Sequence, residues 1–100
     1  MSQALEYVNA VRTRSHAPAI AATSMDLQFI LDERGREFMW EGQRRTDLIR
    51  FGKFTTAAYI WPWKGGVKEG KAVEEYRNLF PLPISDLVAN PNLKQNPGYN

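Results

Sequence analysis

The chain has 100 residues, of which 43% are hydrophobic and 24% charged, with a formal net charge of +2 and no cysteine. This composition is that of an ordinary globular protein and excludes collagen-like and broadly disordered chains. The small net charge gives no support for a nucleic-acid partner, and the lack of cysteine excludes disulfides, a thiolate nucleophile and a cysteine-based zinc site.

Apolar residues near the start of the chain recur at helical spacing. Leu5, Val8 and Val11 lie on one face and predict an amphipathic helix at about 3 to 14. The next stretch, "SHAPAIAATS", contains a proline and small residues that are typical of a connection. Thr23 or Ser24 is placed to cap the helix that follows.

The central segment keeps its apolar residues in one phase from Leu27 to Ile49 when they are plotted at about 100° per residue. This continuity predicts a single helix from about 25 to 51, roughly 40 Å long. Gly42 lies inside it at a cost of roughly 1 kcal/mol relative to alanine, for which the expected reason is close approach of another backbone. Gly52 stands where a left-handed C-cap belongs.

Four charged residues share the apolar face of this predicted helix. Arg34 precedes Glu37 by three residues and Glu41 precedes Arg45 by four, so each acid has a base within reach. Unpaired burial would cost several kcal/mol per charge. The pattern therefore predicts a structural ion ladder. A pair of catalytic carboxylates at Glu37 and Glu41 is the alternative, but the arginines would lower both pKa values and leave no proton donor.

Aromatic residues, prolines and glycines dominate after Lys53. "FTTAAYIWPWKGGVKEGK" predicts a long excursion with little regular structure, and "AVEEYRN" a short helix. The last 22 residues contain four prolines and predict an extended strap, with Ser85 capping a short turn.

Tyr59, Trp61 and Trp63 alternate within the excursion, so an extended chain would point all three rings to one side. The flat faces of sugars pack on such rings, and Lys64 with the following glycines would leave an accessible rim. Large rings also bury in protein cores. A ligand contact and a core contact therefore both stay open. His16 has no second histidine with which to share a metal.

Two motifs resemble the SusD/RagB family over essentially the whole chain. The closing "LFPLPISDLVANPNLKQNPGYN" is similar to the terminal pattern of that family, and "YVNAVRTRS" to one of its helices. Within the central helix pattern of the family, Arg44 to Thr46 of this chain differ, because the family usually has an aromatic residue after the arginine. The family pattern "ER..EF..EG.R..DL.R.GK" falls on Glu33-Arg34, Glu37-Phe38, Glu41-Gly42, Arg45, Asp47-Leu48 and Arg50 to Lys53.

The resemblance implies an all-α fold, the C-terminal part of a tetratricopeptide-like helical array with long irregular loops and an extended C-terminal strap. Residues 1–100 would then be one segment of a longer protein whose signal peptide and lipid-bearing cysteine lie upstream. That protein would be anchored by its lipid to the cell-surface face of the outer membrane.

The resemblance further implies a non-catalytic function without a metal or cofactor. The protein would capture an oligosaccharide or other nutrient for a SusC-like TonB-dependent transporter. One alternative keeps the fold but makes this segment a docking surface for the transporter without ligand contact. Another is a carboxylate-based hydrolase.

Overall fold

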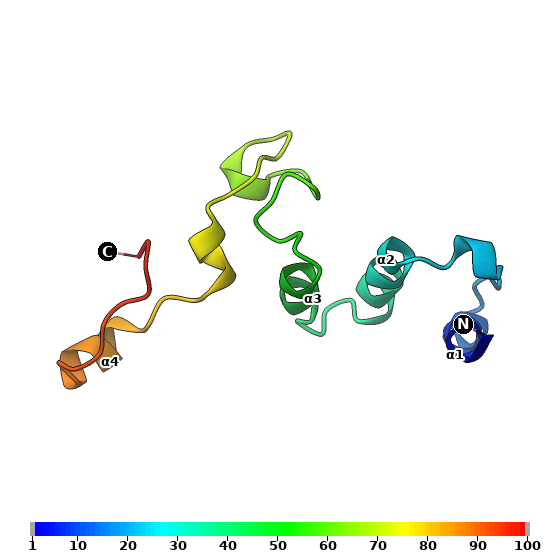
Figure 1. Ribbon diagram of the computed structural model, residues 1–100, viewed down its shortest axis with the longest axis horizontal. Helices are drawn as coiled ribbons and strands as arrows, with labels where there is room; N and C mark the ends of the chain where they lie inside the picture. Colours follow the sequence, from blue (N-terminus) through cyan, green and yellow to red (C-terminus); the bar gives the residue numbers. More distant parts are fainter. Residues whose placement is uncertain (1, 100) are drawn as a thin grey trace. The chain divides into compact units, whose positions relative to one another are not determined.

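The computed structural model describes residues 2–99, which form helices and turns and contain no strand (Figure 1). The predicted all-α fold is confirmed. The chain divides into two compact units, Met1–Arg44 and Arg45–Asn100. None of the helices in the described part combines the length and apolar character that a membrane crossing needs.

Within residues 2–99, four α-helices and three short 3-10 turns follow one another along the chain (Figure 1). The α-helices are α1 (Ser2–Arg14), α2 (Leu27–Glu37), α3 (Arg44–Arg50) and α4 (Ile84–Ala89), and the 3-10 turns are Ala22–Ser24, Lys64–Gly66 and Glu75–Asn78.

Helix α1 confirms the helix predicted at 3 to 14. Side chains on it hold the connection that follows, because the Asn9 amide donates to the Ile20 carbonyl at 3.1 Å and accepts from the Ile20 N–H at 2.8 Å. The Arg12 Nε donates to the Pro18 carbonyl at 2.7 Å. The proline-containing connection is therefore tied to the helix by polar contacts.

Helix α2 begins one turn later than the predicted cap. Asp26 is its N-cap, and its carboxylate accepts a hydrogen bond from the Phe29 N–H at 2.7 Å. Thr23 and Ser24 lie in the preceding 3-10 turn, so their predicted capping role is wrong. Leu31 on α2 has no exposed surface and forms the centre of the first unit.

The single helix predicted from 25 to 51 is wrong. Helix α2 ends at Glu37 and α3 begins at Arg44, with turns between them. Trp40 and Gly42 have φ angles of 67° and 74°, in the left-handed region that a right-handed helix excludes.

The interruption coincides with residues that gain nothing from burial. Met39 is 70% and Trp40 is 96% exposed, so no packing energy opposes the helix penalty of Gly42. The apolar periodicity correctly indicated helices on both sides, α2 and α3, but the residues between them are not helical. The glycine serves a turn and not the close helix packing that was expected.

Helix α3 ends as predicted. Gly52 has a φ of 67°, the Gly52 N–H donates to the Ile49 carbonyl at 3.0 Å, and the Lys53 N–H donates to the Leu48 carbonyl at 2.7 Å. This is the left-handed C-cap for which glycine is the preferred residue. Leu48 is 3% exposed and anchors the helix in the second unit.

The terminal segment folds back on the residues before α4. The Gln95 amide bonds both backbone groups of Leu82, at 2.8 and 3.0 Å, and the Asn96 amide donates to the Phe80 carbonyl at 2.7 Å. Ser85 lies inside α4 and Pro83 is its N-cap, so the capping role predicted for Ser85 is wrong.

Candidate functional site

The second unit contains a hollow of about 560 Å³ beside the aromatic segment. Its wall combines aromatic rings, small residues and charged side chains, which is the mixture that sugar binding needs. The lining residues are Phe54, Trp61, Lys64, Gly65, Gly66, Lys71, Ala72, Val73, Glu74 and Arg77.

Trp61 is the centre of the aromatic wall. Its ring stacks on Phe54 with 6.4 Å between centroids and 26° between planes, and it contacts Tyr59 at 5.9 Å with a tilt of 51°. The structure thus brings two of the three predicted rings together, with Phe54 as a third member that the sequence pattern did not single out.

Trp63 departs from the predicted alternation. Its φ of 68° is left-handed, so the backbone is not extended there. The ring is 67% exposed, and Trp63 is not among the residues that line the hollow. The expectation that all three rings share one side therefore does not hold, because it assumed an extended chain.

Lys64 is buried, with 3% of its surface exposed, which contradicts the expected accessible rim. Its Nζ donates to the backbone carbonyls of Tyr59 at 2.6 Å, Thr56 at 2.7 Å and Lys53 at 3.4 Å. The same nitrogen lies 4.6 Å from the Trp61 ring centroid. Burial lowers the pKa of Lys64.

This carbonyl cage was missed by the sequence reasoning. A lysine between a tryptophan and two glycines resembles a solvated loop residue. The signal available in the sequence was the Gly65-Gly66 pair, because glycine readily adopts left-handed φ angles that turn the chain sharply. In the structure Trp63, Gly65 and Gly66 are all left-handed.

Two glycines let the loop close tightly around the hollow. A Cβ at Gly65 would lie 2.7 Å from the Lys71 side chain, and a Cβ at Gly70 would lie 2.3 Å from the Trp61 carbonyl oxygen. Both residues also have left-handed φ angles, of 67° and 78°. Glycine is required at these positions by both space and conformation.

The rim of the hollow carries an ion pair between Glu74 and Arg77, with the Arg77 Nε 2.6 Å from a Glu74 carboxylate oxygen. The hydrogen bond from Arg77 lowers the pKa of Glu74, so the carboxylate is ionised at neutral pH. With exposed Lys71, the rim offers an acceptor and cationic donors to a polar ligand.

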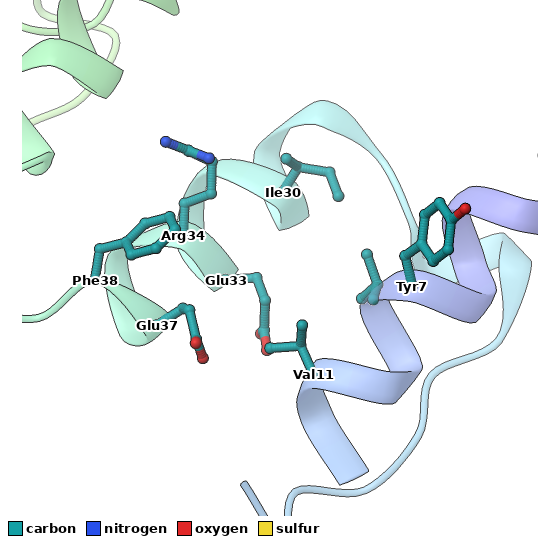
Figure 2. Close-up of a pocket in the computed structure, with 8 residues that line it drawn as sticks. Tyr7, Val11, Ile30, Glu33, Arg34, Glu37 and Phe38 are labelled. Atoms are coloured by element: carbon teal, nitrogen blue, oxygen red, sulfur yellow. The ribbon is translucent and has the colours of Figure 1, made fainter. Parts of the chain in front are cut away.

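The first unit has a smaller hollow of about 240 Å³ between α1 and α2. In Figure 2, Tyr7 and Val11 of α1 and Ile30 of α2 project toward it. Its lining is mainly apolar, with charged residues at the edge. The lining residues are Tyr7, Val8, Val11, Ile30, Glu33, Arg34, Glu37 and Phe38.

Ion pairs join the two helices at this edge. The Arg12 Nη1 lies 2.8 Å from a Glu33 oxygen, and both side chains keep 14% of their surface exposed. The Arg36 Nη2 contacts the same oxygen at 2.6 Å, and Arg14 pairs with Glu37. The Arg12–Glu33 and Arg14–Glu37 pairs link α1 to α2.

The predicted ion ladder had named Arg34 and Arg45 as the partners of the two acids. The Arg34 guanidinium lies 4.9 Å from the Phe38 ring centroid. In the second unit, the Arg45 guanidinium lies 3.7 Å from the Phe80 ring and donates to the Arg77 carbonyl at 2.8 Å. Glu41 is exposed in the turn between helices. Arg34 and Glu37 both lie in α2, but Glu41 lies in the turn after it and Arg45 in α3, so the break removes the helical basis of the Glu41–Arg45 pair.

Glu33 is expected to make stability depend on pH. Burial raises the pKa of its carboxyl group, but hydrogen bonds and charges from Arg36 and Arg12 outweigh this effect and lower it below its ordinary value of 4.5. The stabilisation is then complete above the ordinary pKa and is lost as the pH falls through the lowered one. Denaturant unfolding measured between about pH 6 and about pH 2 should show this loss.

Glu33→Gln is the matched variant, because it keeps the shape of the side chain and removes its titration. The slope of unfolding free energy against pH should be smaller in this variant. An identical slope in both proteins would show that the Glu33 pairs do not form.

Across residues 2–99, no group of three or more His, Cys, Asp or Glu side chains is placed to hold a metal ion. His16 is exposed and lies in the turn after α1, with a φ of 57°.

The sequence profile of the SusD family matches residues 1–99. Among curated proteins, the chain is 46% identical over 92 residues to the starch-binding protein SusD of Bacteroides thetaiotaomicron. That alignment covers 92% of this chain and 16% of the relative, so the chain spans less than a fifth of the length of the curated protein that it matches.

Proposed function

The chain belongs to the SusD family, and from this premise we propose that it is part of a glycan-binding component of an outer-membrane nutrient-uptake system. The observation that carries the proposal is the hollow beside Trp61, where aromatic rings adjoin an ion pair and a lysine. The name of the starch-binding relative favours an oligosaccharide as the ligand.

The wider setting of the proposal follows from the family resemblance. Residues 1–100 would be the C-terminal region of a longer lipoprotein on the cell-surface face of the outer membrane, attached only through its lipid. Its partner would be a SusC-like TonB-dependent transporter, to which it delivers the captured nutrient.

In this proposal the protein binds a glycan and does not catalyse its cleavage. Glu37 is paired with Arg14, and Glu74 is kept ionised by Arg77. Acid–base cleavage of a glycosidic bond needs one carboxyl group that is protonated at the working pH. Glu37→Gln should accordingly leave any glycan affinity unchanged.

Trp61→Ala is expected to weaken glycan binding about tenfold, because it removes the central ring of the hollow. Isothermal titration of the full chain with maltooligosaccharides, after a glycan array has shown which oligosaccharides bind, would measure the loss. Trp63→Ala tests the third predicted ring in the same assay.

Trp40→Ala is the matched control for Trp61→Ala. Trp40 is 96% exposed, belongs to the first unit and is not among the residues that line the hollow. Its removal should leave the affinity unchanged. Equal losses in both variants, or none in Trp61→Ala, would contradict the assignment of the hollow.

A second candidate is docking onto the transporter without ligand contact. It is favoured by exposed apolar side chains in and before α4, where Phe80 is 68%, Ile84 79% and Val88 80% exposed. Under this alternative, Trp61→Ala leaves glycan affinity intact. Replacement of Ile84 and Val88 by serine would instead weaken copurification with the transporter.

A further inference from the structure

Lys64 is the one buried group of the hollow to which the proposed function assigns no task. Its ammonium nitrogen lies within hydrogen-bond distance of three backbone carbonyls and close to the Trp61 ring. We propose that Lys64 is a positioning residue that holds the Trp61 ring in place for stacking against a sugar, an inference that rests on the proposed glycan-binding function.

The number of acceptors around the Lys64 nitrogen matches the number of donors on a protonated lysine. An ammonium group carries three N–H donors and no acceptor, whereas a neutral amine has only two donors. Three carbonyl acceptors, from Lys53, Thr56 and Tyr59, surround this nitrogen at 2.6 to 3.4 Å. The geometry is therefore that of a protonated lysine with every donor used, which fixes the ammonium relative to the backbone of residues 53–59.

The Lys64 ammonium also contacts the Trp61 ring. The fixed nitrogen lies 4.6 Å from the ring centroid, within the range of a cation–π contact, which is stronger when the cation is desolvated. Phe54 and Tyr59 contact the same ring. Lys64 thus connects the ring to the loop backbone, while Trp61 still lines the hollow.

Holding the Trp61 ring in place should raise the affinity for a glycan. A side chain that is ordered before the ligand arrives does not lose its rotational freedom on binding. For one large side chain this gain corresponds to about threefold to tenfold in affinity. Lys64 would contribute this factor without touching the sugar itself, since all its donors are already engaged.

The test uses the lack of cysteine in the chain. Lys64→Cys introduces a single thiol, which is alkylated in denaturant before refolding. Alkylation with 2-bromoethylamine restores an ammonium at nearly the original distance, and alkylation with 2-bromoethanol gives a neutral side chain of the same length that keeps one donor. Both proteins carry Trp40→Phe and Trp63→Phe, so that Trp61 is the sole tryptophan.

The ammonium form is expected to retain the near-ultraviolet circular dichroism of Trp61 and the glycan affinity of unmodified Lys64 in the same background. The neutral form should lose much of that signal and bind maltooligosaccharides about threefold to tenfold more weakly. Equal affinities and spectra in the two forms would overturn the positioning role. A purely structural role would change stability without changing the affinity of the folded protein.

A second measurement covers the case in which the neutral form does not fold. In the unmodified chain, the Lys64 ε-methylene protons should resonate upfield because of the Trp61 ring, and should shift with Trp61 at one dissociation constant during a glycan titration. Unshifted ε protons would overturn the inference. If glycan binds but only Trp61 responds, the inference also fails, while the proposed function stands. Absence of binding to any glycan would overturn the proposed function and the inference with it.

Discussion

Lys64→Met should lower the free energy of unfolding by about 2 to 4 kcal/mol. The substitution preserves much of the side-chain volume but leaves the carbonyls of Lys53, Thr56 and Tyr59 without the donor that they share. Each buried carbonyl without a donor costs about 1 to 3 kcal/mol, and release of a buried charge offsets part of the sum. Chemical denaturation of the full chain at neutral pH measures the change.

Lys71→Met is the control for this experiment. Lys71 is exposed, and the same substitution there removes a charge without opening a carbonyl cage. A change within about 0.5 kcal/mol is expected. A loss below about 1 kcal/mol in Lys64→Met would indicate that water replaces the ammonium at little cost, and that the cage does not hold the loop.

Leu31→Ala should cost about 2 to 5 kcal/mol. Leu31 is the only hydrophobic residue of the described first unit that is buried, with no exposed surface, and its truncation leaves a cavity at this buried position. Its carbonyl also accepts a hydrogen bond from the Arg44 Nη1 at 2.6 Å, which the substitution leaves in place. The expected loss is therefore a packing effect.

Leu27→Ala provides the same chemical change one turn earlier on α2. Leu27 is 74% exposed, so its replacement should alter stability by about 0.5 kcal/mol or less. Urea unfolding followed by helical circular dichroism compares the two variants. Similar losses at both positions would show that the first unit does not have its centre at Leu31.

Periodicity located the elements whose causes are local. The helix at 3 to 14 and the glycine C-cap at Gly52 were predicted, since helical spacing and left-handed glycines act within one or two turns of chain. The short helix predicted at "AVEEYRN" is a 3-10 turn, Glu75–Asn78. The family motifs could also be recognised from the sequence, because they depend on residue identity alone. Of the three rings predicted as ligand contacts, Trp61 is among the residues that line the hollow, and Tyr59 and Trp63 are not.

The same periodicity failed between α2 and α3. A phase that continues across Gly42 shows that two helices could be collinear, but it does not show that the residues between them are helical. Met39 and Trp40 are exposed, so burial gave no energy to extend the helix through this stretch. The Glu41–Arg45 pair of the predicted ion ladder lost its basis with it, because a spacing of four residues brings side chains together only on an intact helix.

Composition, helical spacing, the glycine cap and family membership were determined by the sequence itself, because each depends on residue types over a few positions. The tertiary structure alone decided the partners of the charges. Arg12 reaches Glu33 across 21 residues, and three carbonyls within eleven residues converge on Lys64. Backbone carbonyls are present at every residue and carry no sequence signal, so only the path of the folded chain determines where three of them meet one lysine.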